Sequence, residues 1–245
     1  MQLDDPARHQ EIRDIIRRKP SLRLYYSEVY RKYRESLARC PKEGIALELG
    51  SGCGFAKEEI PGIVTSDVIP YPGVDRVIDG TRMELPDSSL RFLCMQNVLH
   101  HIPDAEAFFR EASRCLLPGG RIFIVDQYAG WPSRWIYKYA HHEPFHPEAD
   151  DWKFASQGPL SDANGALAGI IFERDREKFS RLFPKLELVR YSPHTPLRYW
   201  LTGGLKSWSA LPGWAFPAAT ALDSALARLS PKFASFVDIE LVRKV

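Results

Sequence analysis

The chain has 245 residues, of which 44% are hydrophobic and 26% are charged, and its formal net charge is +2. This length suits one α/β domain with insertions, and the composition excludes a globally disordered protein. The near-neutral charge argues against a nucleic-acid partner, because nucleic-acid-binding proteins usually concentrate basic residues on one face.

The N-terminal segment from Met1 to Lys19 is highly charged and lacks the apolar core of a secretory signal. No uncharged apolar run reaches the roughly 18–20 residues that a membrane-spanning helix needs. The nearest run, 208–222, is interrupted by Pro212 and Pro217. None of the four cysteines forms a C-x-x-C pair, which favours reduced, buried thiols. We therefore expect a cytoplasmic protein with no transmembrane segment, whose surface could still touch a membrane.

Two helices, over 7–19 and 22–39, open the chain, and we assign residues 1–43 to an N-terminal helical lid. Short apolar runs then alternate with helical periodicity. Four of these runs predict buried strands at 44–50, 63–67, 74–79 and 90–96. A helix over 104–117 and a strand over 121–125 follow. This alternation predicts a mainly parallel sheet with right-handed crossovers.

The regular pattern stops twice in the second half of the chain. Residues 128–170 and 192–218 are rich in aromatic side chains and proline, and both stretches are too long for simple connections. We therefore predict two insertions in a domain that spans 44–245. The remaining elements are expected at 173–183 (helix), 185–191 (strand), 219–229 (helix) and 233–242 (strand).

A glycine-rich loop, Glu48-Leu49-Gly50-Ser51-Gly52-Cys53-Gly54, follows the first expected strand. Glycines suit a sharp turn whose backbone a ligand must approach, although a plain tight turn is the alternative. Dinucleotide sites use G-x-G-x-x-G, but Phe55 stands in place of the third glycine. The acidic Glu48 would repel a pyrophosphate and attract a cationic ligand. A nicotinamide-dinucleotide oxidoreductase is therefore the less favoured class.

Two aspartates end the next two expected strands. Asp67 could accept hydrogen bonds from both hydroxyls of a ribose, as acidic residues do in dinucleotide sites, or could cap a turn. Asp79 is followed by Gly80 and Thr81 and could accept a hydrogen bond from an adenine amino group. Both positions fit a nucleoside ligand beside the glycine loop.

The run from Ala46 to Asp126 resembles the class I S-adenosylmethionine (SAM)-dependent methyltransferases, in particular the small-molecule group called type 11. The matching pieces, in order, are ELGSGCG, TSDV, IDGTRMELPDSSL, NVLHHIPD and LLPGGRIFIVD. The resemblance implies an α/β fold with a seven-stranded, mostly parallel sheet of order 3-2-1-4-5-7-6. The last strand would be antiparallel, and helices would cover both faces. SAM would be the cofactor, S-adenosylhomocysteine the product, and 44–245 the SAM-binding Rossmann-like domain.

The resemblance also implies cofactor contacts, position by position. Glu48, Gly50, Ser51, Gly52 and Gly54 would surround the methionine part, Asp67 would hold the ribose, Asp79, Gly80 and Thr81 would flank the adenine, and Gln96 and Asn97 would lie near the amino group and the methyl. The chain departs from the family in three ways. The segment 54–67 holds Pro61-Gly62 and is short, which predicts a stunted first crossover helix. Arg91 replaces a frequent aspartate, and two extra residues separate Asp79 from the pair Leu85-Pro86.

Methyl transfer needs an aligned acceptor and, for some acceptors, a base. Ligands of parallel α/β sheets bind beyond the carboxyl ends of the strands, and histidine can accept a proton near neutrality. The catalytic candidates in such positions are His100, His101, Asp126, His141 and His142. Each could instead pack or hydrogen-bond locally. The run His141-His142-Glu143 contains metal-binding residue types but lacks the i, i+4 spacing of a helical site, so we predict no metal.

The leading prediction is a methyltransferase that acts at oxygen on a small-molecule, lipid-linked or glycan-linked acceptor. The insertion at 192–218 is apolar and carries Arg198 and Lys206, which suits a lipid-linked substrate or a peripheral membrane contact, with simple packing as the alternative. Two other classes remain open: the nicotinamide-dinucleotide oxidoreductase and a SAM-binding partner protein that has lost catalysis.

Overall fold

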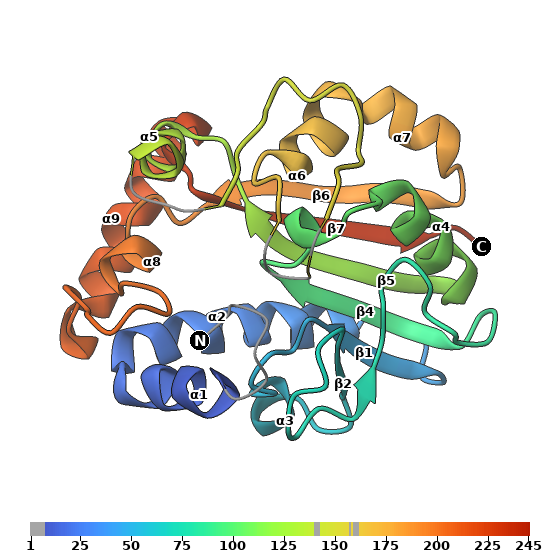
Figure 1. The fold of residues 1–245 in the computed structure, drawn as a ribbon, viewed down its shortest axis with the longest axis horizontal. Helices are drawn as coiled ribbons and strands as arrows, with labels where there is room; N and C mark the ends of the chain where they lie inside the picture. The colour runs from blue at the N-terminus through green and yellow to red at the C-terminus, as the bar shows by residue number, and fades with distance from the viewer. Residues whose placement is uncertain (1–7, 140–142, 157, 159–161) are drawn as a thin grey trace.

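The structure is a computed structural model that describes residues 8–139, 143–156, 158 and 162–245. Its centre is a twisted seven-stranded sheet with helices on both faces (Figure 1), and the strand order is β3-β2-β1-β4-β5-β7-β6. The strands are β1 (Ile45–Leu49), β2 (Val64–Asp67), β3 (Arg76–Val77), β4 (Leu90–Gln96), β5 (Leu116–Gln127), β6 (Leu186–His194) and β7 (Phe236–Arg243). Strands β1 to β5 pair in parallel, whereas β7 is antiparallel to both β5 and β6. The expected fold is confirmed.

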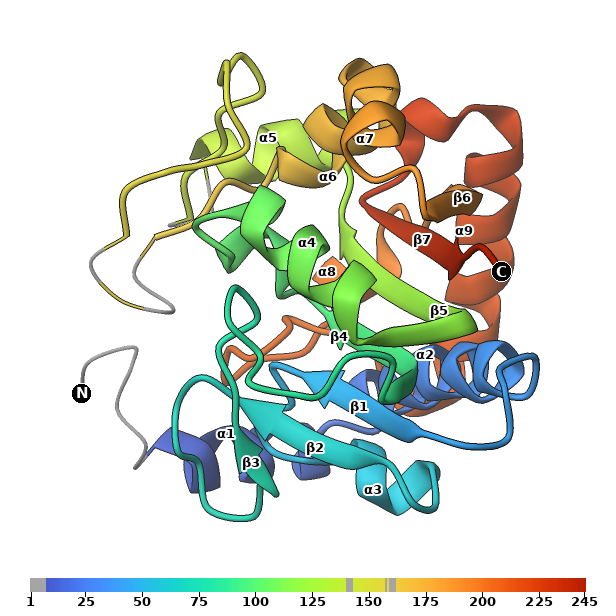
Figure 2. The ribbon, with the colours of Figure 1, turned by 90° about the vertical axis from the view of Figure 1, so that its right-hand side faces the viewer.

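The helices form two layers. They are α1 (Arg8–Arg18), α2 (Pro20–Leu37), α3 (Ala56–Glu59), α4 (Ala105–Cys115), α5 (Trp131–Tyr139), α6 (Leu167–Gly169), α7 (Arg176–Leu182), α8 (Arg198–Leu201) and α9 (Phe216–Leu229), with the short turns η1 (Leu99–His101), η2 (Ile170–Arg174), η3 (Gly213–Ala215) and η4 (Pro231–Phe233). Figure 2 shows α4, α6 and α7 on one face of the sheet and α2 and α9 on the other.

The central strands are mainly apolar because both faces of the sheet are buried. On β4, Phe92 and Cys94 join the hydrophobic cluster that includes α2, whereas Leu93 and Met95 join the cluster that includes α4 and α7. This alternation follows from the two-residue period of a strand. The sheet therefore separates two cores and brings the carboxyl ends of its parallel strands to one edge.

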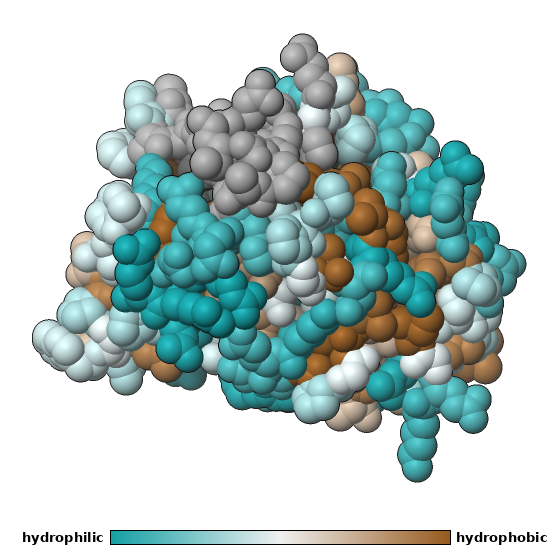
Figure 3. All heavy atoms as spheres, turned by 60° about the horizontal axis from the view of Figure 1, so that its bottom comes forward, coloured by the Kyte–Doolittle hydropathy of each residue, from teal (hydrophilic) through white to brown (hydrophobic). Residues whose placement is uncertain are grey.

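Helix α2 is part of the packed core. The ring of Tyr33 lies 6.2 Å from that of Phe92 and 5.6 Å from that of Phe123, both edge-on. On the preceding residue of the helix, Nζ of Lys32 lies 2.8 Å from Oδ1 of the buried Asp238 on β7. Helix α1 is amphipathic instead, and hydrophilic residues cover the left part of the face in Figure 3, where α1 and α2 lie in Figure 1. The lid function of residues 1–43 stays a prediction, and α1 is the part whose placement suits it.

Several element boundaries differ from the prediction. The stunted crossover is present as α3, which has four residues. The helix expected to run to 117 ends at Cys115, and β5 begins at once with an irregularity that precedes Arg121. Strand β7 begins at Phe236 rather than at 233, because η4 occupies Pro231–Phe233. Strand β6 extends to His194, since its antiparallel pairing with β7 continues to Phe236.

Both insertions contain regular elements that the sequence analysis did not predict. The first carries α5, and its large side chains at positions 131, 135 and 139 are spaced four apart on the solvent side. The second carries α8 and η3. Among the described residues, no helix combines the length and the apolar character needed to cross a membrane.

Candidate functional site

A cavity of about 910 Å³ lies over the carboxyl ends of the parallel strands. The glycine loop after β1, Asp67 at the end of β2 and Gln96 at the end of β4 form its floor. Helix α1 contributes Ile12 and Ile16 to its wall. Both insertions also reach the cavity, so segments far apart in the sequence enclose one space.

The glycine loop has a backbone that only glycine adopts easily. Gly50, Gly52 and Gly54 have φ angles of +66°, +50° and +70°, in the left-handed region that L side chains avoid. A Cβ on Gly50 would lie 2.3 Å from Cγ2 of Val98. Gly50 is therefore required twice, for its backbone conformation and for the close approach of the loop after β4.

Asp67 braces this loop from the neighbouring strand. Its Oδ2 accepts a hydrogen bond from the backbone N–H of Gly52 at 2.9 Å, and its Oδ1 accepts one from Ile69 at 3.1 Å. The side chain is buried and lines the cavity. Burial raises the pKa of the Asp67 carboxyl, and the two backbone donors oppose that shift. The carboxylate is thus held at the cavity wall with lone pairs left for a ligand.

Several buried polar atoms of residues that line the cavity make no hydrogen bond within the described part of the chain. Among them are Oε2 of Glu48, Nε2 of Gln96 and Oδ1 of Asn97. Burial and the nearby charge of Asp67 raise the pKa of Glu48 to about 7. Because a buried polar group without a partner is costly, this wall fits a polar ligand that supplies both donors and acceptors.

The nucleoside end of the predicted site is more open. Asp79 is exposed, and its Oδ1 accepts hydrogen bonds from the backbone N–H and the hydroxyl of Thr81, at 2.8 Å and 2.7 Å. Asp79 and Gly80 line the cavity. Thr81 and Gly54 are not among the described residues that line it, so their contribution is to the shape of the two turns.

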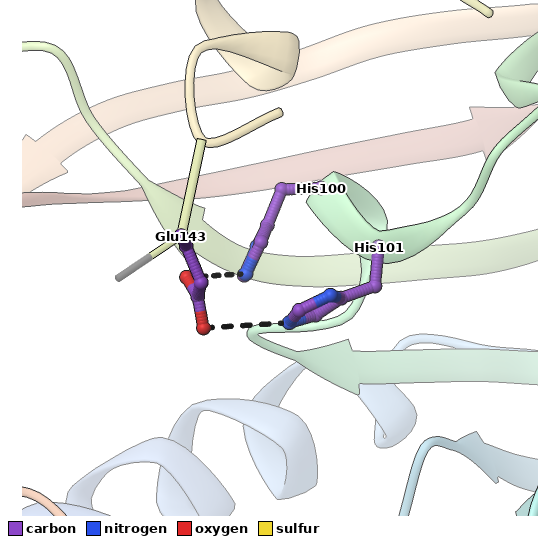
Figure 4. Close-up of side chains that lie close together, drawn as sticks. All are labelled: His100, His101 and Glu143. Carbon is purple, nitrogen blue, oxygen red and sulfur yellow. Dashed lines mark ion pairs between the residues drawn. The ribbon is translucent and has the colours of Figure 1, made fainter. Parts of the chain in front are cut away.

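Opposite the glycine loop, two histidines and a glutamate converge, as Figure 4 shows. Nδ1 of the buried His100 lies 2.5 Å from Oδ1 of Asp126, and its Nε2 lies 3.4 Å from Oε2 of Glu143. Nε2 of His101 lies 3.6 Å from Oε1 of Glu143. Burial by itself would lower the pKa of His100, but its two carboxylate neighbours raise that pKa to about 10. The cluster therefore concentrates acid–base and ligand groups at the cavity.

Side chains behind this cluster hold it in place. Nδ1 of His101 lies 3.1 Å from the backbone oxygen of Asp162. Nε2 of Gln127 donates to Oε2 of Glu143 at 2.9 Å, and the backbone N–H of Gln127 donates to Asp126 at 2.7 Å. Burial would raise the pKa of Glu143, but the two neighbouring histidines hold that pKa well below its usual range.

The catalytic candidates are therefore placed differently. His100 and His101 lie together on the cavity wall. Asp126 is 1% exposed and contacts His100 and Gln127 rather than the cavity, so its placement suits a positioning role. His141 and His142 lie outside the described residues. Glu143 and Gln127, which the sequence analysis did not single out, join the cluster. The run of histidine and glutamate that precedes Pro144 was the available signal for Glu143.

The part of the cavity wall that the two insertions contribute is aromatic. Tyr137 on α5 is buried, and its ring stacks on that of Phe145 at 5.2 Å with an interplanar angle of 5°. The ring of Trp200 on α8 lies edge-on to Tyr137 at 5.9 Å. Trp208 also lines the cavity. An acceptor in this region would meet flat apolar surfaces on the sides and the polar cluster at its end.

Comparison with known proteins adds a family and a fold. Residues 47–124 match the family model Methyltransf_11, described as a methyltransferase domain. The structure is similar to a chain in the complex of the Haloferax volcanii Trm112 methyltransferase activator with a methyltransferase (15% identity, 98% of this chain and 97% of that chain covered, TM-score 0.54). It is also similar to geranyl diphosphate C-methyltransferase from Streptomyces coelicolor A3(2), crystallised with Mg²⁺, geranyl diphosphate and S-adenosylhomocysteine (15% identity, 91% and 82% covered, TM-score 0.50). No curated protein sequence matches significantly.

At 15% identity these likenesses establish the fold, whereas the family match covers the segment with the glycine loop and the histidine pair. The match favours a methyltransferase over the nicotinamide-dinucleotide class, in agreement with the broken dinucleotide fingerprint. Residues 47–124 therefore match a methyltransferase domain, and the described chain has the seven-stranded fold of these solved structures.

Proposed function

We propose that the chain transfers the methyl group of SAM to an oxygen of an acceptor bound between the two insertions. One observation carries the proposal: a single cavity joins the unpartnered polar wall at Glu48, Gln96 and Asn97 to the cluster of His100, His101 and Glu143. The first group of residues fits a cationic amino acid, and the second fits an acceptor that must lose a proton.

The cofactor end follows from charge and hydrogen bonding. The ammonium group of SAM would donate to Glu48, whose free carboxylate oxygen has no other partner within the described chain. Asp67 would accept the ribose hydroxyls with the lone pairs that its backbone donors leave. Asp79 and Gly80 would border the adenine at the open end. The sulfonium would then lie near Asn97, between the glycine loop and the histidines.

The acceptor end follows from the position of the cluster. A hydroxyl of the acceptor would hydrogen-bond to the cluster, which withdraws its proton as the oxygen attacks the methyl carbon. The new O–C bond forms while the C–S bond breaks. The electron pair of the C–S bond goes to sulfur, so that the leaving group is neutral S-adenosylhomocysteine. Alignment of oxygen, carbon and sulfur is the main contribution of the protein, because SAM supplies the activation.

The test separates cofactor binding from transfer. Calorimetric titration of the full chain with SAM and with S-adenosylhomocysteine should give micromolar binding of both. Incubation with methyl-labelled SAM and a cell extract, divided into lipid and aqueous fractions, should then label an acceptor through an ether bond. Glu143→Gln should retain SAM binding and lose labelling. Binding of SAM without any labelled product would favour the alternative of an inactive SAM-binding partner protein. No binding of SAM would refute the proposal.

The surroundings of the cavity favour an acceptor with an apolar part. Trp131, Trp135 and Tyr139 on α5 are 57%, 63% and 65% exposed, and Trp208 and Trp214 of the second insertion are 50% and 86% exposed. Figure 1 shows α5, α8 and α9 at one end of the molecule. Exposed aromatics are typical of the interface between membrane and water. We propose that this end meets a membrane surface, from which a lipid-linked acceptor reaches the cavity.

The free cysteine thiols support a cytoplasmic location. Cys40, Cys53, Cys94 and Cys115 are all free, as is usual in reducing compartments. This supports the proposal of a cytoplasmic protein.

A further inference from the structure

The two histidines of the acceptor-side cluster have their ring nitrogens assigned by their neighbours. Nδ1 of His100 faces a carboxylate oxygen of Asp126 at 2.5 Å, and Nδ1 of His101 faces the backbone oxygen of Asp162 at 3.1 Å. Oxygen acceptors require a proton on each Nδ1. The Nε2 atoms are then the nitrogens on which a metal ion can take the place of a proton, and both face Glu143 (Figure 4).

Two ring nitrogens and a carboxylate that face one another favour a positive charge between them, which a proton or a metal ion can supply. A single proton on Nε2 of His100 would occupy that nitrogen and would leave Nε2 of His101 without a positive partner. The separations from Glu143, 3.4 Å for His100 and 3.6 Å for His101, are also long for direct hydrogen bonds. A tetrahedral metal ion with ligand bonds of about 2.1 Å would hold its ligand atoms about 3.4 Å apart, which is close to both values.

We propose that His100, His101 and Glu143 form a binding site for one divalent transition-metal ion, with Zn²⁺ as the representative probe. One ligand atom from each residue lies within 4.8 Å of the others. Two imidazoles and a carboxylate with room for further ligands are a common donor set for Zn²⁺, Fe²⁺ and related ions, and differ from the all-oxygen sets of Mg²⁺ and Ca²⁺.

The surroundings of the three ligands match those of metal sites. A histidine ligand usually donates its other nitrogen to a carboxylate or a backbone oxygen, as His100 does to Asp126 and His101 to Asp162. Gln127 adds a second observation, because its Oε1 is buried and has no hydrogen-bond partner among the described residues, while its Nε2 lies 3.1 Å from Nε2 of His100. A flip of the amide, which exchanges these two atoms, would present Oε1 as a fourth ligand.

The sequence predicts no metal because Glu143 follows His141 and His142 directly in the chain, without the i, i+4 spacing of a helical site. The tertiary structure joins Glu143 to a histidine pair that is distant in the chain. The consequence for catalysis rests on the proposed function. The acceptor hydroxyl would bind the ion through its oxygen, its pKa would fall, and its proton would leave to solvent water. The resulting alkoxide would then attack the methyl carbon and displace S-adenosylhomocysteine, as described above.

The experiment uses the full chain after treatment with a chelator. Calorimetric titration with Zn²⁺ should show one site per chain. His101→Ala and Glu143→Gln should each lower the Zn²⁺ affinity at least tenfold, and Asp126→Asn, which alters the partner of a ligand, by about 10–100-fold. His146→Ala is the matched control, since His146 is an exposed histidine near Glu143 in the chain, and its affinity should equal that of the unchanged protein.

A second measurement does not depend on the folding of variants. Co²⁺ added to the unchanged protein should give visible absorption bands of nitrogen and oxygen ligation, and Zn²⁺ should abolish them. An intense thiolate band would place the ion on cysteine and overturn the proposal, as would Zn²⁺ affinity unchanged in His101→Ala and Glu143→Gln. An unchanged protein that binds SAM but no Zn²⁺ would mean that a proton occupies the cluster. Zn²⁺ binding without SAM binding would instead reject the proposed function.

Discussion

Oδ2 of Asp67 accepts a hydrogen bond from the backbone N–H of Gly52 at 2.9 Å, so the end of β2 holds the glycine loop that follows β1. A second tie joins the same two segments, because the backbone N–H of Ser51 donates to the oxygen of Ser66 at 2.8 Å. The residue expected to bind the ribose therefore also shapes the loop expected to hold the methionine part of SAM.

Asp67→Ala should weaken SAM binding by about 1–3 kcal/mol, from the loss of hydrogen bonds to a charged acceptor. Asp67→Asn keeps one acceptor oxygen for the loop and should lie between the alanine variant and the unchanged protein. Calorimetric titration with SAM measures both. Asp87→Ala, at an exposed carboxylate outside the cavity, should leave the affinity unchanged. Equal affinity in Asp67→Ala would refute the ribose assignment.

Gly50→Ala should destabilise the fold more than Gly52→Ala. Both positions have positive φ angles, but an added Cβ would meet Val98 at 2.3 Å in the first case and nothing within 4 Å in the second. Backbone strain common to both contributes about 1 kcal/mol, and overpacking adds about 1–3 kcal/mol at Gly50. Urea denaturation measures the difference. Val98→Ala should restore part of the loss in Gly50→Ala only, and an equal loss in the two alanine variants would disprove the close approach.

SAM affinity should depend on the ionisation of Glu48. Its pKa in the folded protein without ligand is about 7, chiefly because of burial, so it is largely neutral below that pH. A cationic ammonium group binds the ionised form more strongly. The affinity should therefore rise as the pH increases through 7, with release of a proton on binding at lower pH. Calorimetry in buffers of different ionisation enthalpy measures this release.

The same group affects the stability of the unliganded protein with the opposite sign. A carboxyl whose pKa is raised on folding binds more protons in the folded state between its unfolded value, 4.5, and about 7. Glu48 should therefore destabilise the fold progressively as the pH rises through this window. Glu48→Gln should flatten both pH profiles. A profile of SAM affinity that is identical in the two proteins would show that Glu48 does not meet the ammonium group.

Trp135→Ser and Trp214→Ser should each weaken binding to anionic lipid vesicles by about tenfold or more, since burial of a large apolar side chain contributes about 1.5–3 kcal/mol. Leu182→Ser is the control, because Leu182 is 46% exposed on α7, which Figure 1 shows at a distance from α5. Vesicle sedimentation measures the bound fraction. Binding that equals that of the unchanged protein in both tryptophan variants would indicate that the aromatic end meets another partner.

Much of the fold could be predicted because its signals are local. Apolar runs that end in glycine or aspartate identified the parallel strands, and the short segment before Asp67 predicted α3. Helix α5 was not predicted because its regularly spaced aromatics point to solvent, whereas helical periodicity normally indicates an apolar face that packs on a core. The extent of β6 was missed because pairing with β7, not its own sequence, continues the strand to His194.

The candidate site divides in the same way. The sequence by itself predicted the residues proposed to hold the cofactor: the glycine loop and the carboxyl that ends β2 follow one another closely in the chain, and the sharp turn after β1 gives the glycines a local signal. Only the tertiary structure brought together the residues proposed to meet the acceptor. Asp126 lies at Nδ1 of His100, and Glu143 lies at its Nε2. These residues come from separate segments of the chain, which only the sheet and the first insertion bring together. Contacts between such segments leave no local pattern, so side-chain packing alone establishes them.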